Sequence, residues 1–303
     1  MLNEKYYALK EIPLYKLSSF NRIYAYLNEP KILKKLNNYQ FLQKIICSFH
    51  DYDNLYLVIN YYPGGNLYNY RNIKMSEEQI KFISACIIQS LTYLRKEKII
   101  SRDVKMQNII MDRKKYLNLI DFSFAINYSD RTNKKKYIFV SPLESSPESK
   151  KYKIYDYSSD YYGLGEIIYY LIFKTYINCV KKKNNVSEIL LDFNNITNYS
   201  KSCIDFVNKL IIEDYRKRNG FNSINELKNH SWFNNFDWKN FENKKIESPL
   251  WFMRKKQSKC SKLLTKRKKR KKKFKYYIRL IKKYDYINKN IINKILNSNK
   301  NMF

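Results

Sequence analysis

The segment from Ile99 to Ala125 reads IISRDVKMQNIIMDRKKYLNLIDFSFA, and the interpretation of the whole chain starts from it. A short apolar run leads into Asp103, and a second run, Tyr116 to Ile120, leads into Asp121. Apolar runs of this length between polar turn residues are typical of short buried strands. We therefore expect two carboxylates, eighteen residues apart, to be carried on strand ends.

Two further side chains accompany the first carboxylate. Lys105 follows Asp103 by two residues, and Asn108 follows Lys105 by three. Phosphoryl transfer requires such a set: a carboxylate near the incoming hydroxyl, a lysine on phosphate oxygens, and an Asp and an Asn that hold Mg²⁺. Charged turns in a β-rich domain would explain any one of these residues but not all of them in this order. The order therefore indicates phosphoryl-transfer chemistry.

The same segment resembles the catalytic loop and the DFG segment of eukaryotic protein kinases, with Ser101 in place of the usual His or Tyr and Ser123 in place of Gly. The resemblance implies an α+β, bilobal protein-kinase-like fold with a truncated small β-rich lobe and a larger, mostly helical lobe. It implies Asp103 and Lys105 as catalytic residues. It also implies ATP as substrate and Mg²⁺ as cofactor, with Asn108 and Asp121 as the metal-binding residues.

A lysine and a glutamate near the start of the chain match the same family. Tyr6 to Ile12 is predicted to be a strand that contains Lys10, and the apolar period of Leu17 to Leu36 predicts a helix that carries Glu29. Kinases hold the α and β phosphates of ATP with a lysine that a glutamate of the following helix fixes. The resemblance therefore implies Lys10 and Glu29 as further nucleotide-binding residues.

The resemblance divides the chain into a kinase domain, residues 1–243, and a basic C-terminal tail, residues 244–303. Within the domain we expect a small lobe over 1–61, a hinge over 62–66 and a large lobe over 67–243. The predicted strands Ile45 to Phe49 and Asn54 to Tyr61 complete the small lobe, and Ser76 with Gln79 predicts a capping box at the start of a helix.

The segments Leu227 to Phe233 and Asp237-Trp238 resemble the end of the large lobe in the AGC group, the relatives of cyclic-AMP-dependent kinase. Ser146-Pro147-Glu148 resembles the APE motif, and Arg218 stands where the partner of its glutamate is expected. Asp160 is expected to hold the catalytic-loop backbone. The resemblance thus implies a serine/threonine protein kinase, with a catalytically inactive kinase-fold scaffold as the alternative. Lys105, two residues after Asp103, favours serine or threonine over tyrosine as the acceptor.

The chain departs from the family in several places. Few residues precede Lys10, so the Gly-rich loop is missing and we expect an N-terminally incomplete kinase. Ser101 predicts weaker packing under Phe122, and Tyr137 stands where related kinases carry a phosphorylated threonine. Related kinases recognise arginines ahead of the substrate's acceptor residue through three acidic residues. The matching residues here are Asn66, Gln107 and Tyr170. The protein substrate is therefore expected not to be basic around its acceptor.

The net charge of +32 is concentrated near the C-terminus, where residues 254–283 hold seventeen Lys or Arg and no acid. Such a run is a solvated segment, a nuclear import signal, or a binding site for nucleic acid or an anionic membrane. Apolar residues from Phe274 to Ile295 recur at roughly helical spacing, as in a helix on a membrane or partner, or one docked on the lobes. The five cysteines form no CxxC pair, which favours an intracellular protein of the cytoplasm or nucleus. No stable oligomer is expected.

Overall fold

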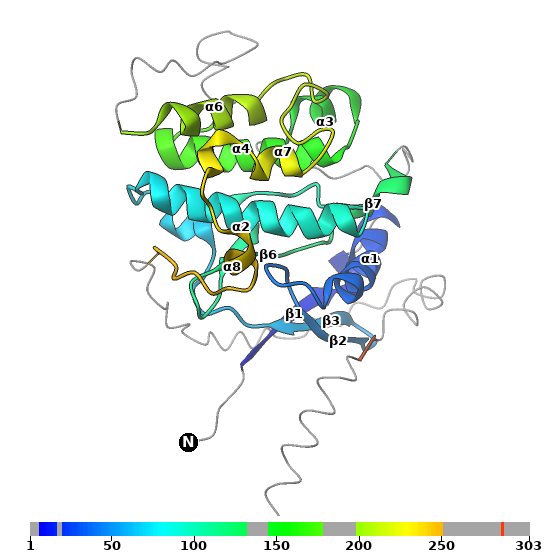
Figure 1. The fold of residues 1–303 in the computed structure, drawn as a ribbon. Coiled ribbons are helices and arrows are strands. Elements are labelled where there is room, and N and C mark those ends of the chain that lie inside the picture. Colours follow the sequence, from blue (N-terminus) through cyan, green and yellow to red (C-terminus); the bar gives the residue numbers. More distant parts are fainter. Residues whose placement is uncertain (1–5, 17–19, 132–144, 178–197, 251–285, 288–303) are drawn as a thin grey trace, which may run out of the picture.

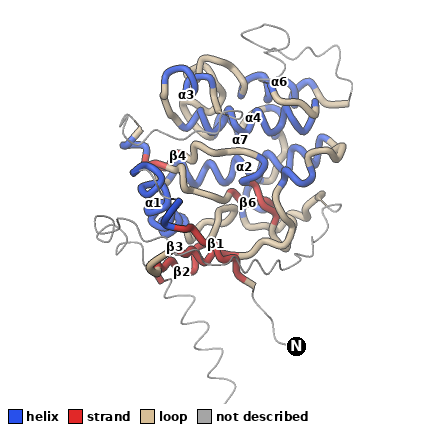
Figure 2. The backbone as a smooth tube through the Cα atoms, turned by 180° about the vertical axis from the view of Figure 1, so that it is seen from behind, coloured by secondary structure: helices blue, strands red, loops and turns tan. Residues whose placement is uncertain are grey.

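The computed structural model describes residues 6–16, 20–131, 145–177, 198–250 and 286–287. Figure 1 shows a small sheet flanked by one helix at one end of the molecule and a stack of helices at the other. Figure 2 shows the same two-part arrangement from behind. The predicted α+β bilobal architecture is confirmed.

The small lobe is built on an antiparallel sheet with strand order β1-β3-β2-β8. Its strands are β1 (Tyr7–Pro13), β2 (Ile45–His50), β3 (Asn54–Asn60) and β8 (Tyr286–Ile287). Because side chains alternate along a strand, Lys10 shares a face of β1 with the buried Ile12, while Leu9 points outward and is 58% exposed. The alternation therefore aims Lys10 at α1 (Phe20–Leu36), the helix that carries Glu29.

The strand β8 revises the expectation for the tail. Periodicity suggested a helix across this part of the chain, but Tyr286–Ile287 pairs with Ser48 and Cys47 of β2 as an added edge strand. A short β-branched and aromatic segment satisfies backbone groups of an open sheet edge when it pairs there. The basic run 254–283 lies outside the described residues, as does Tyr137.

The large lobe is organised around α2 (Glu77–Lys96), whose predicted Ser76–Gln79 capping box is present. Helix α4 (Tyr157–Phe173) is buried along most of its length. Two short strand pairs carry the motif loops between these helices: β4 (Ile99–Ile100) with β7 (Ile126–Asn127), and β5 (Ile109–Met111) with β6 (Leu117–Leu119). The other α-helices in the described ranges are α3 (Pro147–Tyr152), α6 (Lys201–Leu210), α7 (Asn225–Lys228) and α8 (Trp238–Glu242).

The two lobes share one core. Leu119 of β6 donates its backbone N–H to Phe41 and accepts one from Gln43, which joins the large lobe to the segment before β2. The linker after β3 also packs closely against the large lobe. The Gly64 backbone N–H donates to the Met111 carbonyl at 3.2 Å, and a Cβ at Gly64 would lie 2.4 Å from Met111 Cε. Only glycine fits at this approach. In the part of the chain that the structure describes, no helix is long and apolar enough to cross a membrane.

Candidate functional site

Three charged side chains from three separate elements meet between the lobes. Lys10 Nζ of β1 lies 2.9 Å and 3.0 Å from the two carboxylate oxygens of Glu29 on α1. The same Nζ lies 3.2 Å from Oδ1 of Asp121, in the loop after β6. The structure thus brings together three of the six residues that sequence analysis singled out, although they lie up to 111 positions apart in the chain.

The attraction between opposite charges keeps Lys10 and Asp121 ionised. Burial alone would lower the pKa of Lys10, but the Glu29 and Asp121 charges hold it above its ordinary value. Burial alone would raise the pKa of Asp121, but Lys10 and hydrogen bonds from Ser123 lower it. Burial raises the pKa of Glu29, against the opposing effect of Lys10. At neutral pH the cluster therefore presents one ammonium group and a firmly ionised Asp121.

The backbone at Asp121 is in the left-handed region, with φ of 61°. Asp is among the residues that tolerate this conformation. Ser123, which replaces a family glycine, does not adopt positive φ, so its Cβ causes no backbone strain there. The Ser123 N–H donates to Asp121 Oδ1 at 3.3 Å and stabilises the turn. Phe122 between them is fully buried.

The other three predicted residues form a second cluster in the loop after β4. Lys105 Nζ lies 2.7 Å from Oδ1 of Asp103, and Asn108 Nδ2 donates to Oδ2 of Asp103 at 2.7 Å. Burial raises the pKa of Asp103, while Lys105 and Asn108 oppose that shift. Because the nitrogen of the Asn108 side chain is used by Asp103, its amide oxygen is the atom that it can offer to a cation.

Asp160, in the first turn of α4, holds this loop in place. Its carboxylate accepts backbone N–H groups from Ser101 at 2.7 Å and Arg102 at 2.8 Å, as the family resemblance implied. Burial raises the pKa of Asp160 to about 7, although both N–H donors act in the opposite direction. Arg102 itself has φ of 63°. The carboxylate therefore fixes a turn that a non-glycine residue rarely adopts unaided.

The substitution at Ser101 has a visible consequence. The Ser101 side chain is fully buried, and its Oγ has no hydrogen-bond partner among the residues described. A buried hydroxyl without a partner costs free energy. Arg102 next to it donates from Nε to the Phe124 carbonyl at 2.6 Å, and its guanidinium lies over the Tyr155 ring at 5.0 Å.

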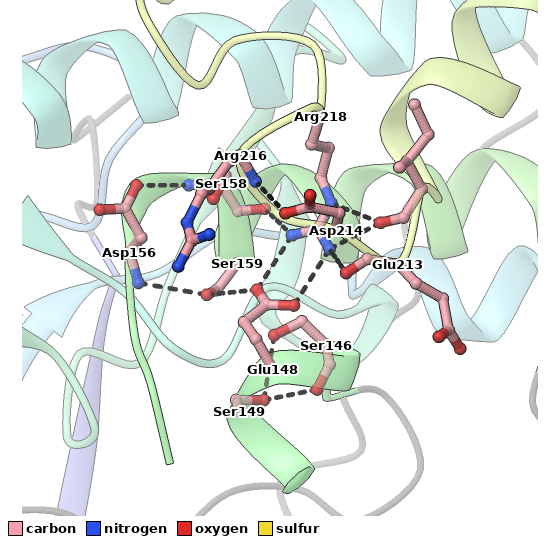
Figure 3. Close-up of polar contacts among 11 residues, drawn as sticks. Ser146, Glu148, Ser149, Asp156, Ser158, Ser159, Glu213, Asp214, Arg216 and Arg218 are labelled. Atoms are coloured by element: carbon pink, nitrogen blue, oxygen red, sulfur yellow. Dashed lines mark hydrogen bonds and ion pairs between the residues drawn. The ribbon is translucent and has the colours of Figure 1, made fainter. Parts of the chain in front are cut away.

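The predicted Glu148–Arg218 pair is present and fully buried. Arg218 donates from Nη1 and Nη2 to the two carboxylate oxygens of Glu148, at 2.9 Å and 3.0 Å. Ser159 donates to the same carboxylate at 2.8 Å. Figure 3 shows the pair holding α3 against the start of α4 and the loop after α6. The contact positions the end of the motif-bearing loop relative to Asp160.

Sequence analysis missed Asn28, which precedes Glu29 on α1. Its Nδ2 donates to the Ala125 carbonyl at 3.0 Å, so it ties α1 to the loop that carries Asp121. No local pattern marks this residue, because its partner lies 97 positions away. Lys35 reinforces the tie through Asn127 Oδ1 at 3.3 Å.

The three positions without the family's acids have other roles in the structure. Asn66 accepts the Asn69 N–H and caps the turn after the linker. Tyr170 packs against Tyr176 with ring centroids 4.6 Å apart. Gln107 leaves its buried Oε1 without a hydrogen-bond partner in the described part of the chain. None of these side chains offers a carboxylate to a basic peptide.

Within the described ranges, no group of three or more His, Cys, Asp or Glu side chains could hold a metal by itself. Asp121 and Asn108 nevertheless offer the oxygen ligands that suit Mg²⁺, which is usually bound by one or two protein groups together with phosphates and water. The donor set therefore fits a magnesium ion that arrives with a nucleotide. The two histidines have other environments: His230 pairs with Asp205 at 2.9 Å, and His50 ends β2.

Comparison with known proteins gives an independent result. Residues 1–233 match the family model described as protein kinase domain. The chain is 28% identical over 255 residues to cAMP-dependent protein kinase catalytic subunit 3 of Drosophila melanogaster, covering 82% of this chain and 43% of that protein. It is 30% identical over 231 residues to cAMP-dependent protein kinase catalytic subunit PRKX of Homo sapiens, covering 74% and 63%. It is 28% identical over 254 residues to serine/threonine-protein kinase sgk-1 of Caenorhabditis elegans, covering 82% and 54%.

The chain spans about half the length of the curated relatives it matches. These relatives confirm the expected similarity to cyclic-AMP-dependent kinases and their group. The alternative of an inactive scaffold finds no support among them, since their names describe kinases. With a family match over most of its length and the motif residues assembled between two lobes, the chain belongs to the protein kinase domain family.

Proposed function

We propose that the protein is a serine/threonine protein kinase that transfers the γ-phosphate of ATP to a hydroxyl of a protein substrate. The observation that supports this most is the contact of Lys10 with both Glu29 and Asp121, at 2.9 Å and 3.2 Å. A lysine held between a buried and a partly exposed carboxylate is positioned to bind phosphate oxygens next to a metal ligand. The relative sgk-1, which is named as a serine/threonine-protein kinase, supports the choice of acceptor.

The Lys10–Glu29–Asp121 cluster and the Asp103–Lys105–Asn108 cluster would have different roles in the reaction. Lys10, fixed by Glu29, would hold the α and β phosphates, and Asp121 and Asn108 would hold Mg²⁺. The ion supplies positive charge that offsets the charge developing on the phosphates. Asp103 would orient the substrate hydroxyl or accept its proton, and Lys105 would steady the transferring phosphoryl group. The contacts of Asp103 with Lys105 and Asn108 fix its carboxylate for that task.

We further propose the division into a small lobe (1–61), hinge (62–66), large lobe (67–243) and basic tail (244–303). A cytoplasmic or nuclear setting accompanies the proposal, because the three cysteines in the described residues are free thiols. The expectation that 254–283 binds nucleic acid or an anionic membrane also stays a prediction.

The test is phosphoryl transfer from radiolabelled ATP to serine- and threonine-containing proteins. Asp103→Asn keeps the shape of the side chain and its contact with Asn108 but removes the base, so transfer is expected to fall by at least about 10²-fold. Asp53→Asn, in the exposed turn before β3, is the matched control and should retain full activity. Equal activity of wild type and Asp103→Asn would refute the role of Asp103. Nucleotide binding without transfer in the wild type would refute the proposed function.

A further inference from the structure

A second surface of the large lobe combines positive charge with exposed apolar side chains. The four residues Lys151 to Ile154 at the end of α3 are all exposed. Tyr152 is 70% exposed and Ile154 is 38% exposed, so two large apolar side chains lie at the surface of this turn. Lys153 ends the helix in the left-handed conformation, with φ of 57°. The turn presents basic and apolar side chains in alternation.

A second basic run lies in a loop that contacts α3. The loop after α6 carries Arg216 and Lys217, both exposed. Lys151 Nζ lies 3.6 Å from Glu213 of the same loop, and the buried Glu148–Arg218 pair joins the two segments from beneath. Figure 3 shows Glu213, Asp214 and Arg216 next to that pair. We call this surface the basic corner: Lys151, Tyr152, Lys153, Ile154, Arg216 and Lys217.

The basic corner is rigidly connected to the candidate catalytic loop. Glu148 of α3 accepts the Ser159 hydroxyl at 2.8 Å, and the next residue, Asp160, holds the N–H groups of Ser101 and Arg102. Both the corner and the loop that carries Asp103 are therefore fixed to the first turn of α4. A polypeptide bound at the corner would keep a constant position relative to Asp103.

We propose that the basic corner is a docking surface for an acidic segment of the protein substrate. The choice of occupant rests on the proposed kinase function. Four cations on the corner, with Lys151 paired to Glu213, attract carboxylates, and Tyr152 and Ile154 offer apolar contacts between them. This charge preference agrees with the lack of carboxylates at Asn66, Gln107 and Tyr170.

An acidic polypeptide fits this corner better than a nucleic acid does. Glu213 and Asp214 lie in the same loop as Arg216 and Lys217, so a continuous phosphate backbone would meet negative charge within the site. A peptide can place its acids opposite the lysines and its apolar residues opposite Tyr152 and Ile154. The alternation of basic and apolar side chains on the basic corner therefore favours a peptide in which acidic and apolar residues alternate.

The experiment measures binding without catalysis. A fluorescein-labelled peptide carries one serine followed by alternating glutamate and leucine residues, and a second peptide has glutamine in place of each glutamate. Fluorescence anisotropy at low ionic strength compares the 303-residue wild type with the double variant Lys151→Glu/Lys153→Glu. Arg113→Glu/Lys114→Glu, in the exposed turn between β5 and β6, is the charge-matched control.

We expect the glutamate peptide to bind the wild type more tightly than the glutamine peptide. The corner variant should lose about tenfold in affinity, because two attractive contacts become repulsive, while the control should stay within about twofold. Melting curves verify that each variant is folded. If Lys151→Glu/Lys153→Glu does not fold, Lys151→Gln/Lys153→Gln is measured in its place. We expect that variant to lose about threefold in affinity for the glutamate peptide.

Equal losses in the corner and control variants would overturn the proposal, because they would show attraction to the net charge alone. So would a corner-dependent loss of binding to duplex RNA or to phosphatidylserine vesicles with unchanged peptide binding. In the kinase assay, the corner variant should raise KM for the glutamate peptide about tenfold and leave kcat unchanged. If the wild type transfers no phosphate but peptide binding depends on the corner, the proposed function fails and the docking surface stands.

Discussion

The Glu148–Arg218 pair and the Lys10–Glu29–Asp121 cluster both contain a buried carboxylate, but their charges and their exposure differ. The first joins one acid to one cation, and the side chains are 3% and 0% exposed. The second joins two acids to one cation, and Lys10 and Asp121 are 29% and 35% exposed. Every nitrogen of the Arg218 guanidinium has an acceptor, including the Ile212 and Ser158 carbonyls.

The difference separates a structural contact from a binding site. A saturated, dry ion pair has no remaining donor or acceptor for a ligand, and removing either partner leaves a buried charge. The Lys10 cluster contains two carboxyl groups for one cation and lies partly open, so the ionised carboxylate of Asp121 is available to an added cation. Stability should therefore depend on Arg218 more than on Lys10, and ligand binding should show the reverse order.

The largest effect is expected from Arg218→Met. The substitution keeps much of the side-chain volume but leaves the Glu148 carboxylate buried without its partner, so the free energy of unfolding should fall by about 3–5 kcal/mol. Urea unfolding followed by circular dichroism measures it. Arg218→Lys keeps the charge but loses the two parallel hydrogen bonds. Its free energy of unfolding should therefore lie between those of the wild type and Arg218→Met. A loss below about 1 kcal/mol for Arg218→Met would contradict the structural role.

Glu148→Gln should cost less, about 2–3 kcal/mol at neutral pH, because the amide still accepts one hydrogen bond from Arg218. Burial alone would raise the pKa of Glu148, but Arg218 holds it below its ordinary value of 4.5. A group with a lowered pKa in the folded state stabilises above its ordinary pKa, and that stabilisation disappears as the pH falls through the folded value. The difference between wild type and Glu148→Gln should therefore shrink below pH 4.5 in unfolding experiments. A constant difference from neutral pH downward would contradict this assignment.

Much of the fold and the candidate site could be predicted from local sequence. The strand with Lys10, the capping box at Ser76, and the order of Asp103, Lys105, Asn108 and Asp121 each depend on residues close together in the chain. Periodicity and capping act over a few residues, so these signals survive without tertiary information.

The rest depends on contacts that no local pattern encodes. Asn28 acquires its role only because Ala125 folds against α1. Tyr286–Ile287 forms a strand because the edge of β2 offers it hydrogen bonds, and helical spacing in the tail could not reveal that edge. The strained φ of Arg102 follows from the Asp160 contact, 58 residues away.

Lys10→Met tests the comparison at the cluster that is proposed to bind a ligand. We expect a stability loss of only about 1–2 kcal/mol, because Glu29 keeps a hydrogen bond from the Phe122 backbone and can take up a proton. The pKa of Glu29 is already raised by burial, so its destabilising charge develops as the pH rises through the folded value. The cost of Lys10→Met should thus be smaller at pH 5 than at pH 7.

Mg-ATP affinity, measured by calorimetry, should fall at least about tenfold in Lys10→Met, which corresponds to about 1.4 kcal/mol. Lys31→Met, exposed on the same helix α1, is the control and should alter neither stability nor nucleotide affinity. If Lys10→Met destabilised the protein as much as Arg218→Met, both clusters would be structural and the comparison would fail.

The smallest effect concerns two buried serines that differ in hydrogen bonding. The Ser101 hydroxyl has no partner among the described residues, whereas Ser149 donates to the Ser146 carbonyl at 2.8 Å. Replacing an unsatisfied hydroxyl removes a desolvation cost, so Ser101→Ala should leave the free energy of unfolding unchanged or raise it by up to about 1 kcal/mol. Ser149→Ala should lower it by about 1 kcal/mol, because it leaves the Ser146 carbonyl without that donor. Equal losses in the two variants would show that the Ser101 hydroxyl is hydrogen-bonded in solution, and the turn before Asp103 would then resemble the saturated Glu148–Arg218 pair.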